Sequence, residues 1–98
     1  MGTEWAVYMI ETHAGSYYTG TTKDVISRYQ THESGAGARA IRLAGGPRGI
    51  VWLREGLPKS DAFRLERAIK QLSRKEKERL IARGLESVGI GPDGRPER

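Results

Sequence analysis

Cysteine is absent from this chain of 98 residues, and its absence excludes two kinds of stabilisation. Without thiols there are no disulfide bonds and no thiolate zinc site, so His13 and His32 are the two imidazoles left to bind a metal. We therefore do not expect a densely ligated metal cage. A chain of this length forms one domain with one modest core.

Long apolar runs are lacking as well. The longest, Trp5–Ile10, has six residues, whereas a transmembrane helix needs about 20. The first residues also lack the basic and then apolar layout of a secretory signal peptide. We expect an intracellular, soluble protein of the cytoplasm that has no membrane partner.

Acidic residues are scarce in the middle of the chain. Residues 28–83 carry fourteen Lys and Arg against six Asp and Glu, while residues 1–27 have a net charge of −2 and residues 84–98 of −1. A basic surface favours polyanions, nucleic acid above all, because each neutralised phosphate releases counterions. A solvated surface that promotes solubility explains the charge about equally well.

The hydrophobic pattern predicts an α+β domain, a small three-stranded antiparallel sheet flanked by helices. The expected order is strand 5–10, strand 16–21, helix 25 to about 34, loop 34–49, strand 49–53, helix 60 to about 72, and helix 73 to about 83. A capping box formed by Ser73 and Glu76 starts the last helix. Residues 84–98 are too poor in apolar periodicity to pack, so we expect a domain over 1–83 and a flexible C-terminal tail over 84–98.

Two adjacent tyrosines, Tyr17 and Tyr18, begin the second strand. In a hairpin centred on His13, Tyr8 lies opposite Tyr18, whereas a slip of one residue puts Tyr8 opposite Thr19 and on the face of Tyr17. One of the two tyrosines should therefore share a face with Tyr8 while the other points away. Composition does not choose between them.

A polar stripe follows on the first predicted helix, where Asp24, Arg28 and His32 are spaced four apart. A guanidinium suits the developing charge of a phosphate because it stays cationic and can bind two oxygens. An exposed Asp24–Arg28 ion pair with a solvated His32 explains the same stripe.

On the next helix, Glu66 lies three residues from Phe63 and from Ile69, at the edge of the apolar face. A half-buried carboxylate is costly unless a cation neutralises it, and one carboxylate is enough for a Mg²⁺ site that water and phosphate complete. Helix statistics alone favour a salt bridge from Glu66 to Lys70 or Arg67.

The loop from 35 to 49 could hold a phosphodiester through backbone N–H groups and through Arg39, Arg42 and Arg48. It is not a P-loop, and a plain connection between helix and strand is an equal alternative. Trp5 and Trp52 lie on predicted strands, so we assign them to the core.

The ordered set "VYMI…GSYYTGTT…R…H…G.GA.A…LE..IK.LSR.EK..LI", from about Trp5 to Ile81, resembles the GIY-YIG nuclease superfamily, in particular its small stand-alone bacterial members. The resemblance implies a metal-dependent phosphodiesterase acting on nucleic acid. It makes Tyr18 the motif tyrosine and Tyr17 the structural one.

The same resemblance implies that Glu66 holds one Mg²⁺ or Mn²⁺ and that Tyr8 is the candidate general base. Tyr18 would position phosphate or water, Arg28 would balance the charge of the transition state, and His32 would act as an auxiliary acid, base or orienting group. A free phenol has a pKa of about 10, so Tyr8 needs nearby positive charge to act as a base. Many members have a lysine where this chain has Thr21, which leaves the base open.

We therefore expect a metal-dependent endonuclease acting on DNA more than RNA, selective for structure over sequence, with a role in DNA repair or recombination. Lys70 joins the three loop arginines as an expected nucleic-acid contact, and a protein partner could add specificity. One alternative is a nucleic-acid-binding module without turnover, which Thr21 and the complete lack of asparagine favour. Another is a basic domain that binds a protein.

Overall fold

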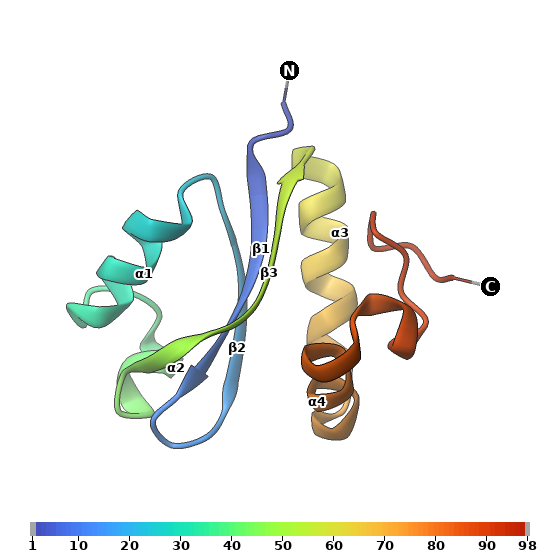
Figure 1. Ribbon diagram of the computed structural model, residues 1–98. Helices are drawn as coiled ribbons and strands as arrows, with labels where there is room; N and C mark the ends of the chain where they lie inside the picture. The colour runs from blue at the N-terminus through green and yellow to red at the C-terminus, as the bar shows by residue number, and fades with distance from the viewer. Residues whose placement is uncertain (1, 98) are drawn as a thin grey trace.

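Three antiparallel strands form one sheet with helices on both faces, as the sequence predicts (Figure 1). The computed structural model describes residues 2–97. The strands are β1 (Trp5–Thr12), β2 (Tyr17–Thr22) and β3 (Pro47–Leu57), in the order β2-β1-β3. The helices are α1 (Val25–Glu33), α2 (Arg39–Leu43), α3 (Lys59–Lys70) and α4 (Arg74–Arg83), followed by the 3₁₀ helix η1 (Leu85–Val88).

The central strand β1 explains the unbroken apolar run, because both of its faces are covered. Val7 and Met9 point into a core shared with α3 and α4, whereas Tyr8 and Ile10 point into a smaller cluster on the side of α1 and α2. All four side chains are almost fully buried. Successive residues of a strand point to opposite faces, so one strand supplies both cores.

The hairpin register differs from both sequence-based alternatives. Tyr8 pairs with Gly20, because β1 continues to Thr12 and the turn is closed by the Thr12 N–H donating to the Ser16 carbonyl (2.9 Å). The turn is therefore centred one residue beyond His13, and the register moves by two residues. The expectation that Tyr8 lies directly opposite Tyr18 is wrong.

A shift of two residues preserves the face of each side chain. Tyr18 pairs with Ile10 and joins the cluster on the α1 side with Tyr8, while Tyr17 packs against the core under α3 and α4. The Arg74 guanidinium lies 4.6 Å from the centre of the Tyr17 ring. The choice that composition left open is thus settled by the fold.

The helix starts follow local capping chemistry. The Asp24 carboxylate accepts the Ser27 N–H at α1 (3.0 Å), and Ser73 and Glu76 form the expected reciprocal capping box at α4. β3 extends beyond the apolar stretch 49–53 to include Arg48, Arg54 and Glu55, because an outer strand with one solvated side tolerates charged residues.

The C-terminal residues pack, contrary to the expectation from their weak periodicity. Ile90 is 6% exposed and belongs to the larger core cluster, and the Arg64 guanidinium donates to the Asp93 carbonyl (3.0 Å). The segment is held by Ile90 in the core, by Leu85 and Val88 packed against it, and by hydrogen bonds to its main chain, none of which shows as periodicity. The domain boundary at residue 83 stays a prediction.

Between residues 2 and 97, every helix is too short or too polar to cross a membrane.

Candidate active site

Tyr8 and His32 form a buried hydrogen bond between the sheet and α1. The Tyr8 hydroxyl lies 3.0 Å from His32 Nε2, and each residue is 3% exposed. The backbone N–H of Ala38 donates to His32 Nδ1 (3.3 Å). Because Nδ1 accepts, the neutral ring carries its hydrogen on Nε2 and donates it to the Tyr8 oxygen. His32 is therefore not the solvated side chain of the alternative interpretation.

Two glycines make room for this pair. A methyl group at Gly20 would lie 2.5 Å from the Tyr8 hydroxyl oxygen, so the phenol end of Tyr8 lies directly over β2. A methyl group at Gly37 would overlap His32 Nδ1. The glycine of the Tyr-Thr-Gly motif and the second glycine of the Gly-Ala-Gly-Ala loop are thus required by close approach rather than by backbone torsion.

Tyr18 completes an aromatic group with the buried pair. Its ring centre lies 5.6 Å from that of His32 in an edge-to-face arrangement and 6.4 Å from that of Tyr8. Tyr18 is only partly buried, so its hydroxyl belongs to the outer part of the group.

Arg28 lies one turn before His32 on α1 and is exposed. Its positive charge is felt by both buried groups: it lowers the pKa of His32 and opposes the rise in the pKa of Tyr8. No ion pair joins Asp24 to Arg28 in residues 2–97, because Asp24 caps the helix. Among the described residues, no carboxylate is therefore paired with the Arg28 guanidinium.

Burial has opposite effects on the two proton affinities. It lowers the pKa of His32, with a second contribution from Arg28, so the ring is neutral at pH 7. Burial first, and then the charges of Tyr18 and Glu66, raise the pKa of Tyr8 to about 12. Without added positive charge the phenol keeps its proton.

Glu66 belongs to a helix on the other face of the sheet, since α3 packs opposite α1 (Figure 1). Its charge makes the smallest contribution to the raised pKa of Tyr8, after burial and the charge of Tyr18. β2 is an outer strand, and its Gly20 lies directly under the Tyr8 hydroxyl. α3 packs against β1 and β2 from the other face.

The carboxylate of Glu66 is paired with Lys70 Nζ at 3.1 Å, as helix statistics favoured. The side chains are 22% and 54% exposed, respectively. Such a partly exposed pair contributes about 0 to 1 kcal/mol, little enough for a divalent cation to displace the ammonium. Among residues 2–97 there is no group of three or more His, Cys, Asp or Glu that could hold a metal.

The predicted loop arginines lie on the same side of the sheet as Tyr8. Arg39 and Arg42 are exposed on α2, whose Ile41 packs beside Tyr8, and Arg48 is exposed near the start of β3. Arg42 Nη1 donates to the Gly35 carbonyl (3.4 Å).

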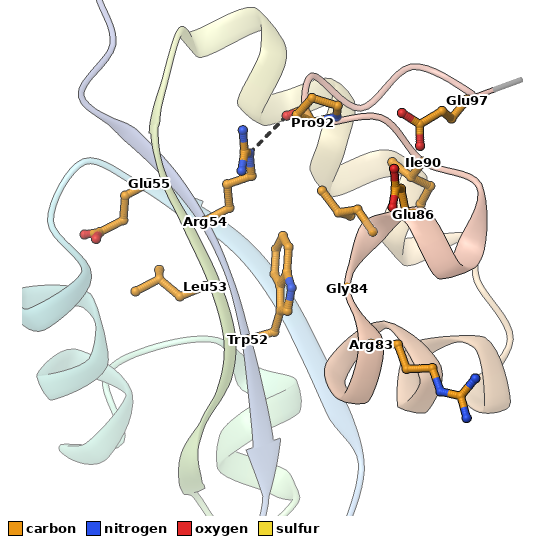
Figure 2. Close-up of a pocket in the computed structure, with 11 residues that line it drawn as sticks. Trp52, Leu53, Arg54, Glu55, Arg83, Gly84, Glu86, Ile90, Pro92 and Glu97 are labelled. Carbon is orange, nitrogen blue, oxygen red and sulfur yellow. Dashed lines mark hydrogen bonds between the residues drawn. The ribbon is translucent and has the colours of Figure 1, made fainter.

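A groove of about 690 Å³ lies elsewhere, between β3 and the C-terminal segment, and contains none of the predicted site residues. Figure 2 shows Trp52 and Arg54 pointing into it and Leu53 and Glu55 pointing to the opposite side of β3. Arg54 Nε donates to the Pro92 carbonyl across the groove (3.1 Å). Trp52 packs partly buried against the core, as expected.

Sequence reasoning missed two participants. The Ala38 N–H fixes the His32 tautomer, and Gly37 lets that ring approach the backbone. The Gly-x-Gly spacing three to five residues after His32 is the available signal, but by itself it indicates a phosphodiester-holding loop or a plain connection equally well.

The chain is similar to known proteins over most of its length. The family model described as the GIY-YIG catalytic domain matches residues 4–79. The UPF0213 protein YhbQ of Escherichia coli O1:K1 is 44% identical over 85 residues, covering 84% of this chain and 81% of that protein, and YhbQ of Escherichia fergusonii is equally similar. The solution NMR structure of the UPF0213 protein BH0048 from Bacillus halodurans has a TM-score of 0.53 and 39% identity, covering 86% of this chain and 89% of that one.

Proposed function

This chain belongs to the GIY-YIG family, and from that premise we propose that it is a divalent-metal-dependent endonuclease that hydrolyses phosphodiester bonds in DNA. The observation that carries the proposal is the buried Tyr8–His32 hydrogen bond, which fixes a phenol oxygen next to the ring of Tyr18 and one helical turn from Arg28 on α1.

Glu66 fits a hard divalent cation such as Mg²⁺ or Mn²⁺. It is a single half-buried carboxylate whose partner, Lys70, is 54% exposed, and Mg²⁺ commonly takes one or two carboxylates and fills its other positions with water and phosphate. When bound, the cation would polarise the phosphate and acidify water.

His32 acts as an orienting group in this proposal. Its Nε2 hydrogen is engaged by Tyr8 and its Nδ1 lone pair by the Ala38 N–H, so the neutral ring has no free site to accept a proton. The hydrogen bond that it donates favours the ionised form of Tyr8. Tyr8 accepts the proton of the attacking water once positive charge at the site has lowered its pKa.

Arg28 and Tyr18 act on the phosphate. Arg28 is exposed and unpaired among the described residues, so its guanidinium can meet the charge that develops on the phosphate oxygens. The Tyr18 hydroxyl positions the phosphate or the water. Arg39, Arg42 and Arg48, on the same side, extend the contact with the backbone of the nucleic acid.

The proposal predicts that Glu66→Gln and Arg28→Ala each abolish metal-dependent nicking of DNA while the fold is kept. The first removes the charge that holds the cation, and the second removes charge stabilisation worth 10²-fold or more, on the order of that of other electrostatic catalytic groups. Nicking of plasmid and oligonucleotide substrates with Mg²⁺ or Mn²⁺ measures both, and circular dichroism checks the fold.

Glu78→Gln and Arg83→Ala, both on exposed positions of α4, are the matched controls and should cleave normally. Nicking retained in both site variants would refute the assigned site.

We extend the proposal to selectivity for structure over sequence, because so small a chain has little surface for reading bases. We also propose a role in DNA repair or recombination. A panel of hairpin, flap, nicked and single-stranded oligonucleotides of scrambled sequence tests this selectivity. Strong dependence on sequence would contradict it.

A nucleic-acid-binding module without turnover is the second candidate. It is favoured by the raised pKa of Tyr8 and by the neutralised Glu66. Binding without any product, with both metals and across the panel, would select it. A binding constant insensitive to salt would instead indicate a protein partner.

A further inference from the structure

A cluster of two aromatic rings and two lysines lies at the start of β1, away from the aromatic group of Tyr8, Tyr18 and His32. The Trp5 and Phe63 rings meet edge to face, with their centres 5.4 Å apart. Lys23 Nζ lies 5.4 Å from the centre of the Trp5 ring, and Lys59 Nζ lies 5.8 Å from that of Trp5 and 5.6 Å from that of Phe63. We call these four residues the Trp5 cluster.

The Trp5 cluster is continuous with Glu66 along α3. Lys59, Phe63, Glu66 and Lys70 are spaced four, three and four residues apart, so they lie along one flank of the helix. Glu66 is one turn beyond Phe63, about 4.5 Å along the axis. The cluster therefore begins one turn from the carboxylate that we assign to the metal.

The opposite flank of α3 is closed by the C-terminal segment. The Arg64 side chain donates to the Asp93 carbonyl, and a methyl group at Gly94 would lie 2.5 Å from the Leu65 nitrogen. Within residues 2–97 the flank that carries Phe63 has no such cover, and Phe63 is 39% exposed. The sequence-based assignment of Trp5 to the core therefore describes only part of its environment. Trp5 packs on the core and also borders this open flank.

The charges of the Trp5 cluster are poorly balanced from within the chain. Two ammonium groups converge on the Trp5 ring, and the one ion pair among them in residues 2–97 joins Lys23 to Glu4 at 3.6 Å, both well exposed. Such a pair is screened and weak. Two cations held against one aromatic surface suit an anionic ligand that also presents flat rings.

Unpaired nucleotides have this chemistry. Surfaces that bind single strands combine aromatic side chains, on which bases stack, with cations that follow the phosphates. A base pair inside a duplex has its faces covered by neighbouring pairs and offers none to Phe63. The geometry assigns the Trp5 cluster to an unpaired nucleotide beside the phosphodiester at Glu66, so that the DNA substrate contains a single-stranded segment. This inference rests on the proposed function, which places the phosphodiester at Glu66, but the binding of the nucleotide to the Trp5 cluster does not require cleavage.

Tryptophan fluorescence tests the binding in the presence of EDTA, where no cleavage occurs. In the Trp52→Phe protein, Trp5 is the remaining tryptophan and reports on the cluster. The ligands are oligothymidylate of roughly 12 nucleotides, an abasic deoxyribose phosphate strand of the same length, and a blunt duplex.

We expect oligothymidylate to quench Trp5 and to bind more tightly than the abasic strand. Phe63→Leu in this background should weaken oligothymidylate binding roughly 5- to 100-fold, the range for one stacked base, and change duplex binding less than about 2-fold. Lys59→Gln should weaken binding more than Lys75→Gln, which removes an exposed cation from α4.

Equal binding of the thymidylate and abasic strands, or equal effects of Lys59→Gln and Lys75→Gln, would overturn the inference. Loss of binding in Phe63→Leu from a protein that cleaves nothing would uphold the Trp5 cluster and refute the nuclease proposal. Cleavage of a flap that Phe63→Leu leaves unchanged would uphold the nuclease and refute the cluster.

Discussion

His32 links three parts of the molecule at the scale of single residues. Its Nδ1 accepts from the loop after α1, its Nε2 donates to the central strand, and its ring contacts Tyr18 edge to face. A neutral imidazole with both nitrogens occupied holds the Tyr8 oxygen in place without exchanging protons. Proton transfer at this site is therefore assigned to Tyr8 and its bound water.

Replacing Gly20 with alanine tests the close approach that permits this arrangement. The new methyl group would lie 2.5 Å from the Tyr8 hydroxyl oxygen, so the phenol must move and its hydrogen bond to His32 must lengthen or break. We expect a loss of about 1 to 3 kcal/mol in the free energy of unfolding, measured in urea. Gly49→Ala is the control, because its methyl group meets nothing within 4 Å; equal losses in both variants would contradict the account.

The pH dependence of stability tests the burial of His32. Because burial lowers its pKa in the folded state, the unfolded chain binds a proton first as the pH falls below about 6.5, and stability is lost. The free energy of unfolding should therefore fall between about pH 7.5 and about pH 5.5, above the range in which carboxylates titrate. His13→Gln should keep this fall, since His13 is exposed, and His32→Gln should reduce it; the reverse would show that His32 is not the group responsible.

At the scale of elements, strands and helices were predictable where a local pattern determines them. The apolar run of β1, the Asp24 cap and the Ser73 capping box each act within a few residues. The hairpin register was not predictable, because the sequence does not show that β1 continues to Thr12. The face of Tyr18 followed from parity together with the family resemblance, and it survives the error in register.

The C-terminal segment was the largest miss, because it is held by a few apolar side chains, Ile90 above all, that contact a core built from distant parts of the chain. Ile90→Ala should lower the free energy of unfolding by about 2 to 3 kcal/mol, since Ile90 is almost fully buried against the core under α3 and α4. Ile26→Ala, on a residue that is 74% exposed, should change it by less than about 0.5 kcal/mol. Urea unfolding measures both, and a neutral Ile90→Ala would show that the segment does not contribute to the core.

At the scale of the whole molecule, the sheet separates the two halves of the candidate site. α1 brings Arg28 and His32 to one face, α3 brings Glu66 to the other, and Gly20 of the outer strand β2 lies under the Tyr8 hydroxyl. Sequence spacing indicated both helices and their polar residues. It could not indicate that the sheet lies between the two helices, because this depends on strand order and on which face each helix covers.

The central claim is that these two halves serve one metal-dependent centre. Amide NMR spectra recorded with substoichiometric Mn²⁺ test it directly, because the paramagnetic ion broadens signals near its binding site. The account predicts broadening of Glu66 on α3 together with Gly20 on β2, and its loss in Glu66→Gln. Broadening that leaves Gly20 unaffected, or that persists in Glu66→Gln, would contradict it.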